Sequence, residues 1–284
     1  MIDKAVRADL HCHSFYSDGV LAPCALAERA RAHGVQLWAL TDHDELAGID
    51  QARQAARQIG LGFVSGVEVS VTWAHRTVHV VGLGIDETNA ALKQGLAQIR
   101  DIRTERASDI DAHLAARGVN NALAGAIKHV RNPNLVSRTH FARHLHEAGY
   151  VESLQAAFDR YLGDAIMGMG QTVWARLDEA IGWIRGAGGV AVLAHPGRYD
   201  LNDLQFDALL TDFRDHGGQA IEVCTGSHTD AQSRQFAQVA RDYGFWASSG
   251  SDFHGPGETR LDLGGVASLP SDLEPVWAHL VCES

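Results

Sequence analysis

The 284-residue sequence predicts an α/β fold in which short strands, each followed by a helix, build a parallel sheet or a barrel. Two observations support this prediction. Short apolar segments alternate with amphipathic, alanine-rich segments from residue 7 to residue 71, and the same alternation returns after residue 172. Between them lies a long region with a helical pattern and no strand pattern, which indicates an insertion.

The first part of the chain contains the elements from which the sheet would start. Its helices are expected to end at Gly34 and Gly60, because glycine commonly stops a helix. The segment 70–84 alternates between apolar and polar residues and is predicted to form a hairpin that turns near His75 and Arg76. The predicted strands are 6–10, 37–40 and 62–67, and the predicted helices are 23–33 and 46–59.

Residues 88–172 are predicted to form a helical insertion that caps the carboxyl ends of the strands. Its predicted helices are 90–117, 136–149 and 154–162. The insertion has 10 Lys and Arg against 8 Asp and Glu, whereas the whole chain has a formal net charge of -11. We therefore expect a barrel domain made of residues 1–87 and 173–284, and an insertion domain made of residues 88–172.

The last part of the chain resumes the alternation of strand and helix. Each predicted strand again ends in a polar loop, and each helix again has one apolar face. The predicted strands are 189–194, 220–224 and 245–249, and the predicted helices are 177–186, 204–216 and 231–243.

The composition excludes several classes of protein. No apolar run approaches the roughly 18 residues of a membrane helix, and the first residues show no signal-peptide pattern, so we expect a cytoplasmic protein without a membrane partner. The four cysteines have no C-x-x-C spacing, which argues against a zinc ribbon or a disulfide framework. The net charge of -11 argues against tight binding to long duplex nucleic acid. Nothing indicates an obligatory protein partner.

The segment ADLHCHSFYSDG, residues 8–19, contains the first candidate site. Side chains alternate between the two faces of an extended chain, so His11 and His13 should point to one side and Cys12 to the other. Two imidazoles at a strand end can bind one cation. A lone His-x-His is weak support for a metal site, because histidines also occur on strand edges without a ligand.

Further polar residues follow the other predicted strands. In parallel α/β folds these strand ends converge, so residues distant in sequence would meet there. His79 lies among valines in the predicted hairpin, where either a metal or a backbone carbonyl could satisfy it. Nine residues form the candidate set: His11, His13, Asp18, His43, Glu68, His79, His195, Asp252 and His254. This number suits two or three ions with shared carboxylates, and nitrogen and oxygen donors without thiolate suit Zn, Mn or Fe.

The segments around these residues resemble the motifs of the PHP (polymerase and histidinol phosphatase) family. The resemblance covers residues 9 to 256, and it is closest to stand-alone phosphoesterases with a helical insertion. It rests on DLHCHSFYSDG, LTDHDELAG, GVEVS, HVVGLG, LAHPGRY, IEVCTGSH and GSDFHGP. It implies a distorted (β/α)7 barrel with a trinuclear metal site at the carboxyl ends of the strands. It also implies that a metal-bridging hydroxide attacks a phosphoester.

The resemblance further implies a division of the nine ligands among three divalent ions, with Mn expected and Zn, Fe or Mg as alternatives. Glu68 would bridge two of the ions, and His43, Asp252 and His254 are assigned to the catalytic step. By similarity, one ion is held by His11, His13, Glu68 and Asp252, a second by Glu68, His79 and His195, and a third by Asp18, His43 and His254.

Four further residues are candidates for substrate binding. Arg138 and Arg198 could orient a phosphate through paired hydrogen bonds, although each could equally be a surface or salt-bridge residue. His140 lies with Arg138 at a predicted helix start, where backbone N–H groups favour an anion. His228 follows another strand and could contact the substrate or protonate the leaving group.

The expected activity is removal of the 3'-phosphate from a nucleoside 3',5'-bisphosphate such as adenosine 3',5'-bisphosphate. The alternative is 5'-to-3' exonuclease action on short 5'-phosphorylated oligonucleotides at the same site. A histidinol-phosphate phosphatase fits the insertion less well. A non-catalytic metal-binding module is disfavoured, because no ligand position of the family pattern is missing.

Overall fold

The core of the protein is a single mixed sheet. The computed structural model describes residues 6–163, 166 and 172–282, and in these residues eight strands form one sheet. Seven strands follow one another in the order β1-β2-β3-β4-β6-β7-β8, and β5 pairs with β3 outside this path. The strands are β1 Ala8–Asp9, β2 Leu37–Leu40, β3 Gly62–Trp73, β4 Arg76–Leu83, β5 Ala175–Arg176, β6 Val190–Leu193, β7 Ala220–Thr225 and β8 Trp246–Gly250.

The sheet curves until its first and last strands meet. Strands β1 to β3 are parallel to one another, as are β6 to β8, while β4 between these two groups is antiparallel to both β3 and β6. The Leu10 N–H donates to the Ser249 carbonyl at 3.0 Å, and Cys12 forms a parallel bridge with Phe253. The predicted distorted seven-stranded barrel is therefore confirmed, with one reversed strand as the distortion.

The hairpin β3–β4 differs from the prediction in one respect. Its turn lies at Ala74 and His75, both with positive φ, close to the predicted position. However, β3 is one continuous strand of 12 residues, so the predicted break between residues 67 and 70 is wrong. The polar residues Glu68 and Ser70 interrupt the apolar pattern, but both are fully buried inside the strand and face polar side chains from other parts of the fold.

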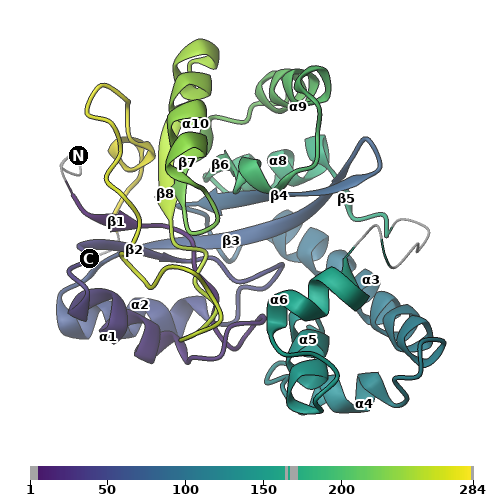
Figure 1. The fold of residues 1–284 in the computed structure, drawn as a ribbon. Coiled ribbons are helices and arrows are strands. Elements are labelled where there is room, and N and C mark those ends of the chain that lie inside the picture. The colour runs from purple at the N-terminus through teal and green to yellow at the C-terminus, as the bar shows by residue number, and fades with distance from the viewer. Residues whose placement is uncertain (1–5, 164–165, 167–171, 283–284) are drawn as a thin grey trace.

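Helices cover the outside of the barrel in the predicted alternation (Figure 1). Helix α1 starts with Pro23 at its first position, and α2 ends at Gly60, whose φ of 66° is left-handed. In α10 the Thr229 side chain and Gln232 form a capping box. The five helices are α1 Pro23–Ala32, α2 Ile49–Ile59, α8 Leu177–Gly186, α9 Asp203–Asp215 and α10 Asp230–Tyr243.

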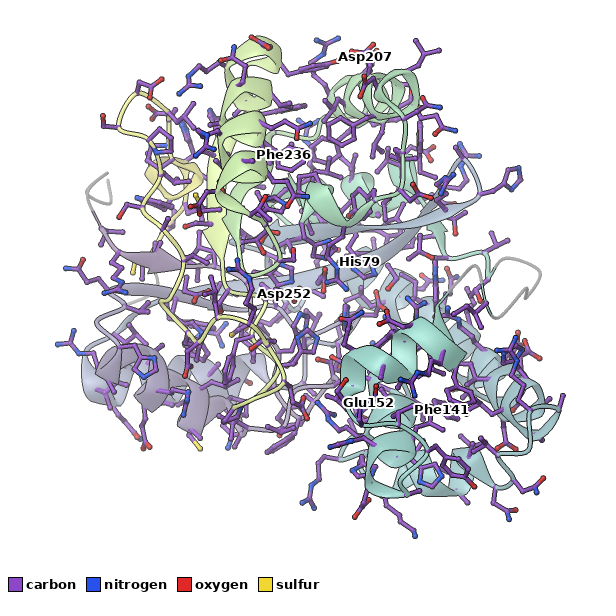
Figure 2. All side chains as sticks on the ribbon, viewed as in Figure 1. His79, Phe141, Glu152, Asp207, Phe236 and Asp252 are labelled. Carbon is purple, nitrogen blue, oxygen red and sulfur yellow. The ribbon has the colours of Figure 1, made fainter. Side chains whose placement is uncertain are left out.

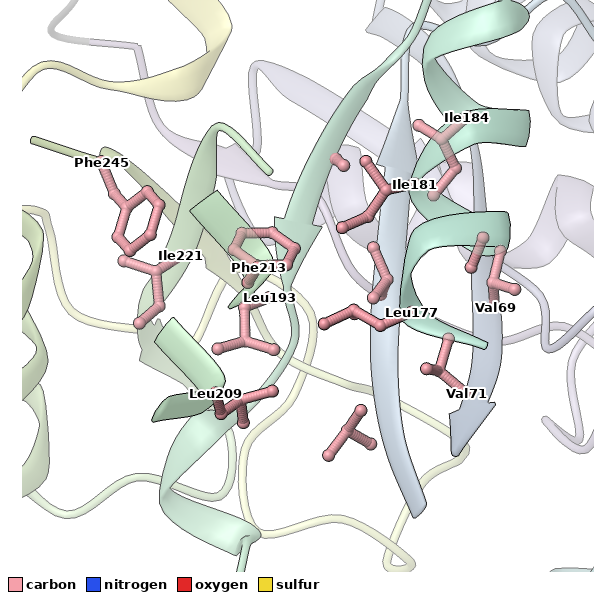
Figure 3. Packing of buried hydrophobic residues seen from close by; sticks show 14 of the residues in the cluster. Val69, Val71, Leu177, Ile181, Ile184, Leu193, Leu209, Phe213, Ile221 and Phe245 are labelled. Atoms are coloured by element: carbon pink, nitrogen blue, oxygen red, sulfur yellow. The ribbon is translucent and has the colours of Figure 1, made fainter. Parts of the chain in front are cut away.

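The largest apolar cluster lies between the sheet and helices α8 to α10. Figure 3 shows Leu177, Ile181 and Ile184 of α8 facing the strands. Their spacing of three and four residues places them on one side of the helix. Phe213 of α9 and Ile221 of β7 continue this cluster, and both are fully buried. Within the described residues, no helix combines the length and hydrophobicity needed to cross a membrane.

The insertion forms a separate helical group beside the barrel, with its own apolar core (Figure 1). Its long first helix agrees with the prediction, whereas the short second helix was not expected. Six alanine-rich residues give too short a pattern to distinguish a helix from a loop. The third predicted helix is divided into an α-helical part and a π-helical turn. The elements are α3 Ala90–Ala115, α4 Ala122–Ile127, α5 Arg138–Glu147, α6 Leu154–Ala157 and the π-helical turn Phe158–Leu162.

The insertion contacts the loops that follow β1, β2 and β8. The Asn132 side chain donates to the Tyr16 carbonyl at 2.9 Å and to a Glu45 carboxylate oxygen at 2.8 Å. Arg143 of α5 donates to the Asp18 carbonyl at 2.5 Å and pairs with Glu258. These contacts place the insertion at the carboxyl ends of the strands. The division at residues 87/88 and 172/173 stays a prediction, and residues 1–5, 164, 165, 167–171, 283 and 284 of the two predicted domains lie outside the described residues.

Candidate metal centre

The structure brings all nine candidate ligands together. They come from β3, β4 and the loops after β1, β2, β6 and β8. Their donor atoms form four overlapping groups, and within each group the atoms lie within 4.8 Å of one another. Figure 2 labels His79 of β4 and Asp252 of the loop after β8, which lie on the side of the barrel that faces the insertion. The predicted convergence of strand ends is therefore observed.

Glu68 lies at the centre of this cluster. Its Oε1 is 2.9 Å from His79 Nδ1 and 2.9 Å from His195 Nε2. Its Oε2 is 3.3 Å from the Nε2 atoms of both His11 and His13. One carboxylate thus faces two separate pairs of imidazoles, as a carboxylate that bridges two cations would.

The opposite end of the cluster is built around Asp18 and Asp252. Asp18 Oδ1 is 3.3 Å from His254 Nε2 and 3.9 Å from His43 Nε2. Asp252 Oδ1 is 3.2 Å from His13 Nε2. The other nitrogen of His43, Nδ1, lies 2.9 Å from Glu68 Oε2, so this ring connects the two ends.

The grouping of donor atoms overlaps with the predicted division among three ions and differs from it in detail. The trio Asp18, His43 and His254 is found together, but it also includes His13. The assignment of each residue to one ion stays a prediction. The observed groups are His13 with Asp18, His43 and His254; His11 with Glu68 and His195; His11 with His13 and Asp252; and His43 with Glu68 and His79.

Several buried atoms in this cluster have no hydrogen-bond partner among the described residues. They include Asp18 Oδ1 and Glu68 Oε2, both carboxylate oxygens. The Nε2 atoms of His11 and His13 are 3.2 Å apart, so each faces another ring nitrogen. Burying charged or polar atoms without a partner is costly, and a cation would satisfy all of them together. The donor set therefore fits divalent metal ions.

The protonation states also suit metal binding. Burial alone would raise the pKa of Glu68, but His43, His79 and His11 outweigh it and hold that pKa well below its usual value. Burial lowers the pKa of His43 to about 4, and likewise that of His195. At neutral pH the carboxylate is therefore ionised and these two imidazoles are neutral, which are the forms that bind a metal.

His13 behaves differently in the protein without metal. Burial would lower its pKa, but hydrogen bonds to Asp252 and Glu68 raise it to about 10. A bound cation would take the place of this proton, so metal binding at His13 releases a proton.

Two of the candidate ligands have unusual backbone conformations. His195 has a φ of 27° and Asp252 a φ of 54°, in a region that residues other than glycine seldom adopt. Strained residues of this kind concentrate at functional sites, where the surrounding structure holds them in place.

Glu222 of β7 is part of the site, although sequence reasoning missed it. It is buried, and its Oε1 lies 2.8 Å from His11 Nδ1 while its Oε2 accepts the His195 N–H at 2.6 Å. It thereby directs His11 Nε2 toward Glu68 and fixes the backbone of His195. A lone carboxylate in the apolar strand AIEVCT was the available signal.

Asp42 supports the first loop in a similar way. It accepts hydrogen bonds from the Ser14 N–H at 2.7 Å and from the Ser17 hydroxyl at 2.6 Å. The Ser17 hydroxyl is 3.4 Å from His13 Nδ1. Cys12 points away from the cluster, as predicted, and its Sγ accepts a hydrogen bond from the Trp38 ring N–H at 3.1 Å.

The four predicted substrate-binding residues lie in different surroundings. Arg198 is at the cluster, with its Nη1 2.9 Å from Asp252 Oδ2 and half of its side chain exposed. His228 uses both ring nitrogens within the fold: Nδ1 donates to the Val223 carbonyl at 3.1 Å, and Nε2 accepts the Gly197 N–H at 3.1 Å. His228 therefore supports the turn that holds Arg198.

The other two candidates belong to helix α5 of the insertion. His140 is buried, and its Nδ1 accepts the Ser137 N–H at 3.0 Å, which completes a capping box. Arg138 donates to the Leu162 carbonyl at 3.3 Å and lies over the Phe158 ring. The hydrogen bonds named here for both residues have their partners in the insertion, and substrate binding by any of the four residues stays a prediction.

Comparison with known proteins gives relatives that cover nearly the whole chain. A 3',5'-nucleoside bisphosphate phosphatase from Chromobacterium violaceum is 47% identical over 272 residues, which cover 96% of this chain and 95% of that protein. A 5'-3' exoribonuclease from Haemophilus influenzae is 39% identical over 271 residues, which cover 95% of this chain and 98% of that protein.

The solved structures agree with this relationship. An amidohydrolase from Chromobacterium violaceum, with bound sulfate and no metal, matches with a TM-score of 0.93 and 47% identity, covering 96% of this chain and 95% of that chain. The PHP domain family itself matches residues 9–167, more than half of the sequence. The fold, the site and these similarities together show that the chain belongs to the PHP domain family.

Proposed function

We propose that this protein is a metal-dependent phosphoesterase that removes the 3'-phosphate of nucleoside 3',5'-bisphosphates, giving a nucleoside 5'-monophosphate and phosphate. The observation that carries the proposal is the convergence of nine buried or half-buried donors on one site. The 47% identity to a 3',5'-nucleoside bisphosphate phosphatase supports the choice of substrate.

Three divalent ions, with manganese as the first candidate, are the proposed cofactors. The imidazole and carboxylate donors suit manganese, zinc or iron, and none of the donor groups among the described residues includes a cysteine. When bound, such ions acidify a coordinated water and neutralise charge on a phosphoryl group.

The proposed approach of the substrate follows from exposure within the cluster. The side chains of His11, His13 and Glu68 are fully buried, whereas those of His43, His254 and His79 are 12%, 15% and 18% exposed. The half-buried side therefore faces the substrate. His43, His254 and the neighbouring Asp252 are the residues that we assign to the catalytic step.

Arg198 lies on this same side and supplies a positive charge for the phosphate. Its contact with Asp252 Oδ2 keeps its guanidinium next to the site, and its exposed half can still donate to a phosphate oxygen. The buried carboxylates stay ionised at neutral pH, so they need no proton transfer before they hold a cation.

A 5'-to-3' exonuclease acting on short oligonucleotides is the second candidate. The 39% identity to a 5'-3' exoribonuclease over nearly the whole chain supports it. Both reactions would use the same donors and differ only in whether the scissile phosphate is terminal or joins two nucleotides. A cytoplasmic location is also proposed, supported by the four free cysteines.

The test compares release of phosphate from adenosine 3',5'-bisphosphate with release of nucleotide from a 5'-phosphorylated dinucleotide, each with added manganese. The phosphatase proposal predicts the higher kcat/KM for the bisphosphate. Histidinol phosphate and the variant Asp252→Asn serve as controls, and both should give little product. If neither nucleotide is hydrolysed, both proposed activities are wrong.

A further inference from the structure

Helix α3 of the insertion reaches the loop after β2 through a buried arginine. Arg103 has a side chain only 7% exposed, and its Nε and Nη2 lie 2.7 and 2.6 Å from Asp44 Oδ2. Its Nη2 also donates to the Ser70 hydroxyl at 2.7 Å. One turn earlier, Arg100 donates to the Asp44 carbonyl at 2.7 Å. Two arginines of the insertion therefore hold one residue of the barrel.

Asp44 lies next to two of the candidate metal ligands, His43 and Glu68. It follows His43 directly, and its N–H donates to the Glu68 carbonyl at 2.9 Å. Its carboxylate accepts the Ser70 N–H at 2.7 Å and the Ser70 hydroxyl at 2.9 Å. Asp44 thus fastens the His43 loop to β3 at Glu68 and at Ser70, with a φ of 50° that needs such support.

The charge of Asp44 makes Arg103 necessary for this arrangement. Asp44 is fully buried, and a buried carboxylate is stable only when it is paired and hydrogen-bonded. Arg103 provides the opposite charge, and its guanidinium packs over the Trp174 ring at 5.1 Å. Arg103 therefore contacts Asp44 of the barrel and also Trp174, which lies just after the insertion where the chain returns to the barrel.

We propose that Arg103 is a positioning residue of the metal centre. Through Asp44 it holds His43 and Glu68 at the separation that a cation requires, so helix α3 acts as part of the support of the site. This inference rests on the proposed function only in that the cluster binds divalent ions. If Arg103 acts in this way, substitutions in the insertion should alter the affinity of the barrel site for metal through Asp44.

The test uses the full chain with Arg103→Met and Arg103→Lys. The matched control is Arg241→Met, which removes an arginine of helix α10 that binds both carboxylate oxygens of Asp272. The metal-free proteins are titrated with manganese alone by calorimetry. Far-ultraviolet circular dichroism reports folding, and phosphate release from adenosine 3',5'-bisphosphate is measured across manganese concentrations.

Arg103→Met should bind manganese about 10- to 100-fold more weakly, the usual size of such indirect effects. Arg103→Lys, which keeps the charge and loses the paired geometry, should lie between it and the wild type. Extra manganese should restore part of the rate of Arg103→Met, which a general loss of structure would not allow. Arg241→Met should bind manganese as the wild type does.

Wild-type manganese affinity in a folded Arg103→Met would overturn the proposal. Should Arg103→Met fail to fold, Arg103→Lys takes its place, because the lysine keeps a positive charge next to Asp44. Wild-type manganese affinity in Arg103→Lys would then overturn the proposal. The titration contains no substrate, so weaker binding in these variants supports the proposal even when the wild-type protein hydrolyses no bisphosphate. The failure of the proposed activity and the failure of this inference are therefore distinguishable.

Discussion

Replacing Glu222 by alanine should destabilise the metal-free protein and weaken its metal binding. Glu222 accepts hydrogen bonds from His11 and from the His195 backbone, at 2.8 and 2.6 Å, and all three residues are buried. Alanine removes both acceptors. Because water does not reach these donors, both remain without a partner in the folded state.

The size of the effect follows from these two contacts. Each buried donor left without a partner costs roughly 1–3 kcal/mol, so Glu222→Ala should lower the free energy of unfolding by about 2–6 kcal/mol. Glu222→Gln keeps one acceptor and should lose about half of this. Metal affinity should fall roughly 10- to 100-fold, because His11 loses the partner that orients its ring.

The assay is urea unfolding of the metal-free protein followed by tryptophan fluorescence, together with a manganese titration. Glu152→Gln is the control, since Glu152 lies on the surface of the insertion with a 65% exposed side chain (Figure 2). This control should change stability by no more than about 0.5 kcal/mol. The reasoning fails if Glu222→Ala unfolds at the same urea concentration as the control and binds manganese equally well.

Three further predictions concern metal removal, acid stability and the insertion. A chelator should abolish phosphate release, and added manganese should restore it, as measured by released phosphate. Burial lowers the pKa of His140 from 6.5 to about 4, so between these pH values the unfolded chain binds a proton that the folded chain does not. His140 alone should therefore account for a loss of roughly 3 kcal/mol as the pH falls from 6.5 to 4, and His140→Gln, which can keep the helix cap, should lose that much less stability than the wild type over this pH range in urea unfolding. Phe141 is fully buried in the core of the insertion, and Phe141→Ala should cost about 3–5 kcal/mol in thermal unfolding, while Tyr150→Ala at the surface should cost little.

The convergence of the candidate ligands could be predicted from the sequence because it depends on topology. His11, His43 and His195 each follow a parallel strand, and such strand ends meet at one edge of a barrel. No knowledge of side-chain packing is needed for that step. The helices around the barrel were predictable for the same reason, since their apolar faces and glycine ends are local signals.

Other features depend on partners that only the fold brings together. Glu68 and Ser70 suggested a strand end, yet both lie inside β3, because imidazoles and Arg103 satisfy them there. The sequence predicted His228 as a loop residue that could contact the substrate. In the structure its two ring nitrogens form hydrogen bonds with the Val223 carbonyl and the Gly197 N–H. A polar residue in isolation does not reveal whether its partner will be a ligand or the protein itself.

The contact between β1 and β8 closes the barrel, and it has a consequence for how the protein folds. His13 and Asp252 come within 3.2 Å of each other although nearly the whole chain separates them in sequence. Contacts of such high sequence separation form late, because a long loop must be ordered first. Tight metal binding should therefore arise only at the final step of folding, and metal affinity can serve as a measure of how much of a sample has reached the closed native state.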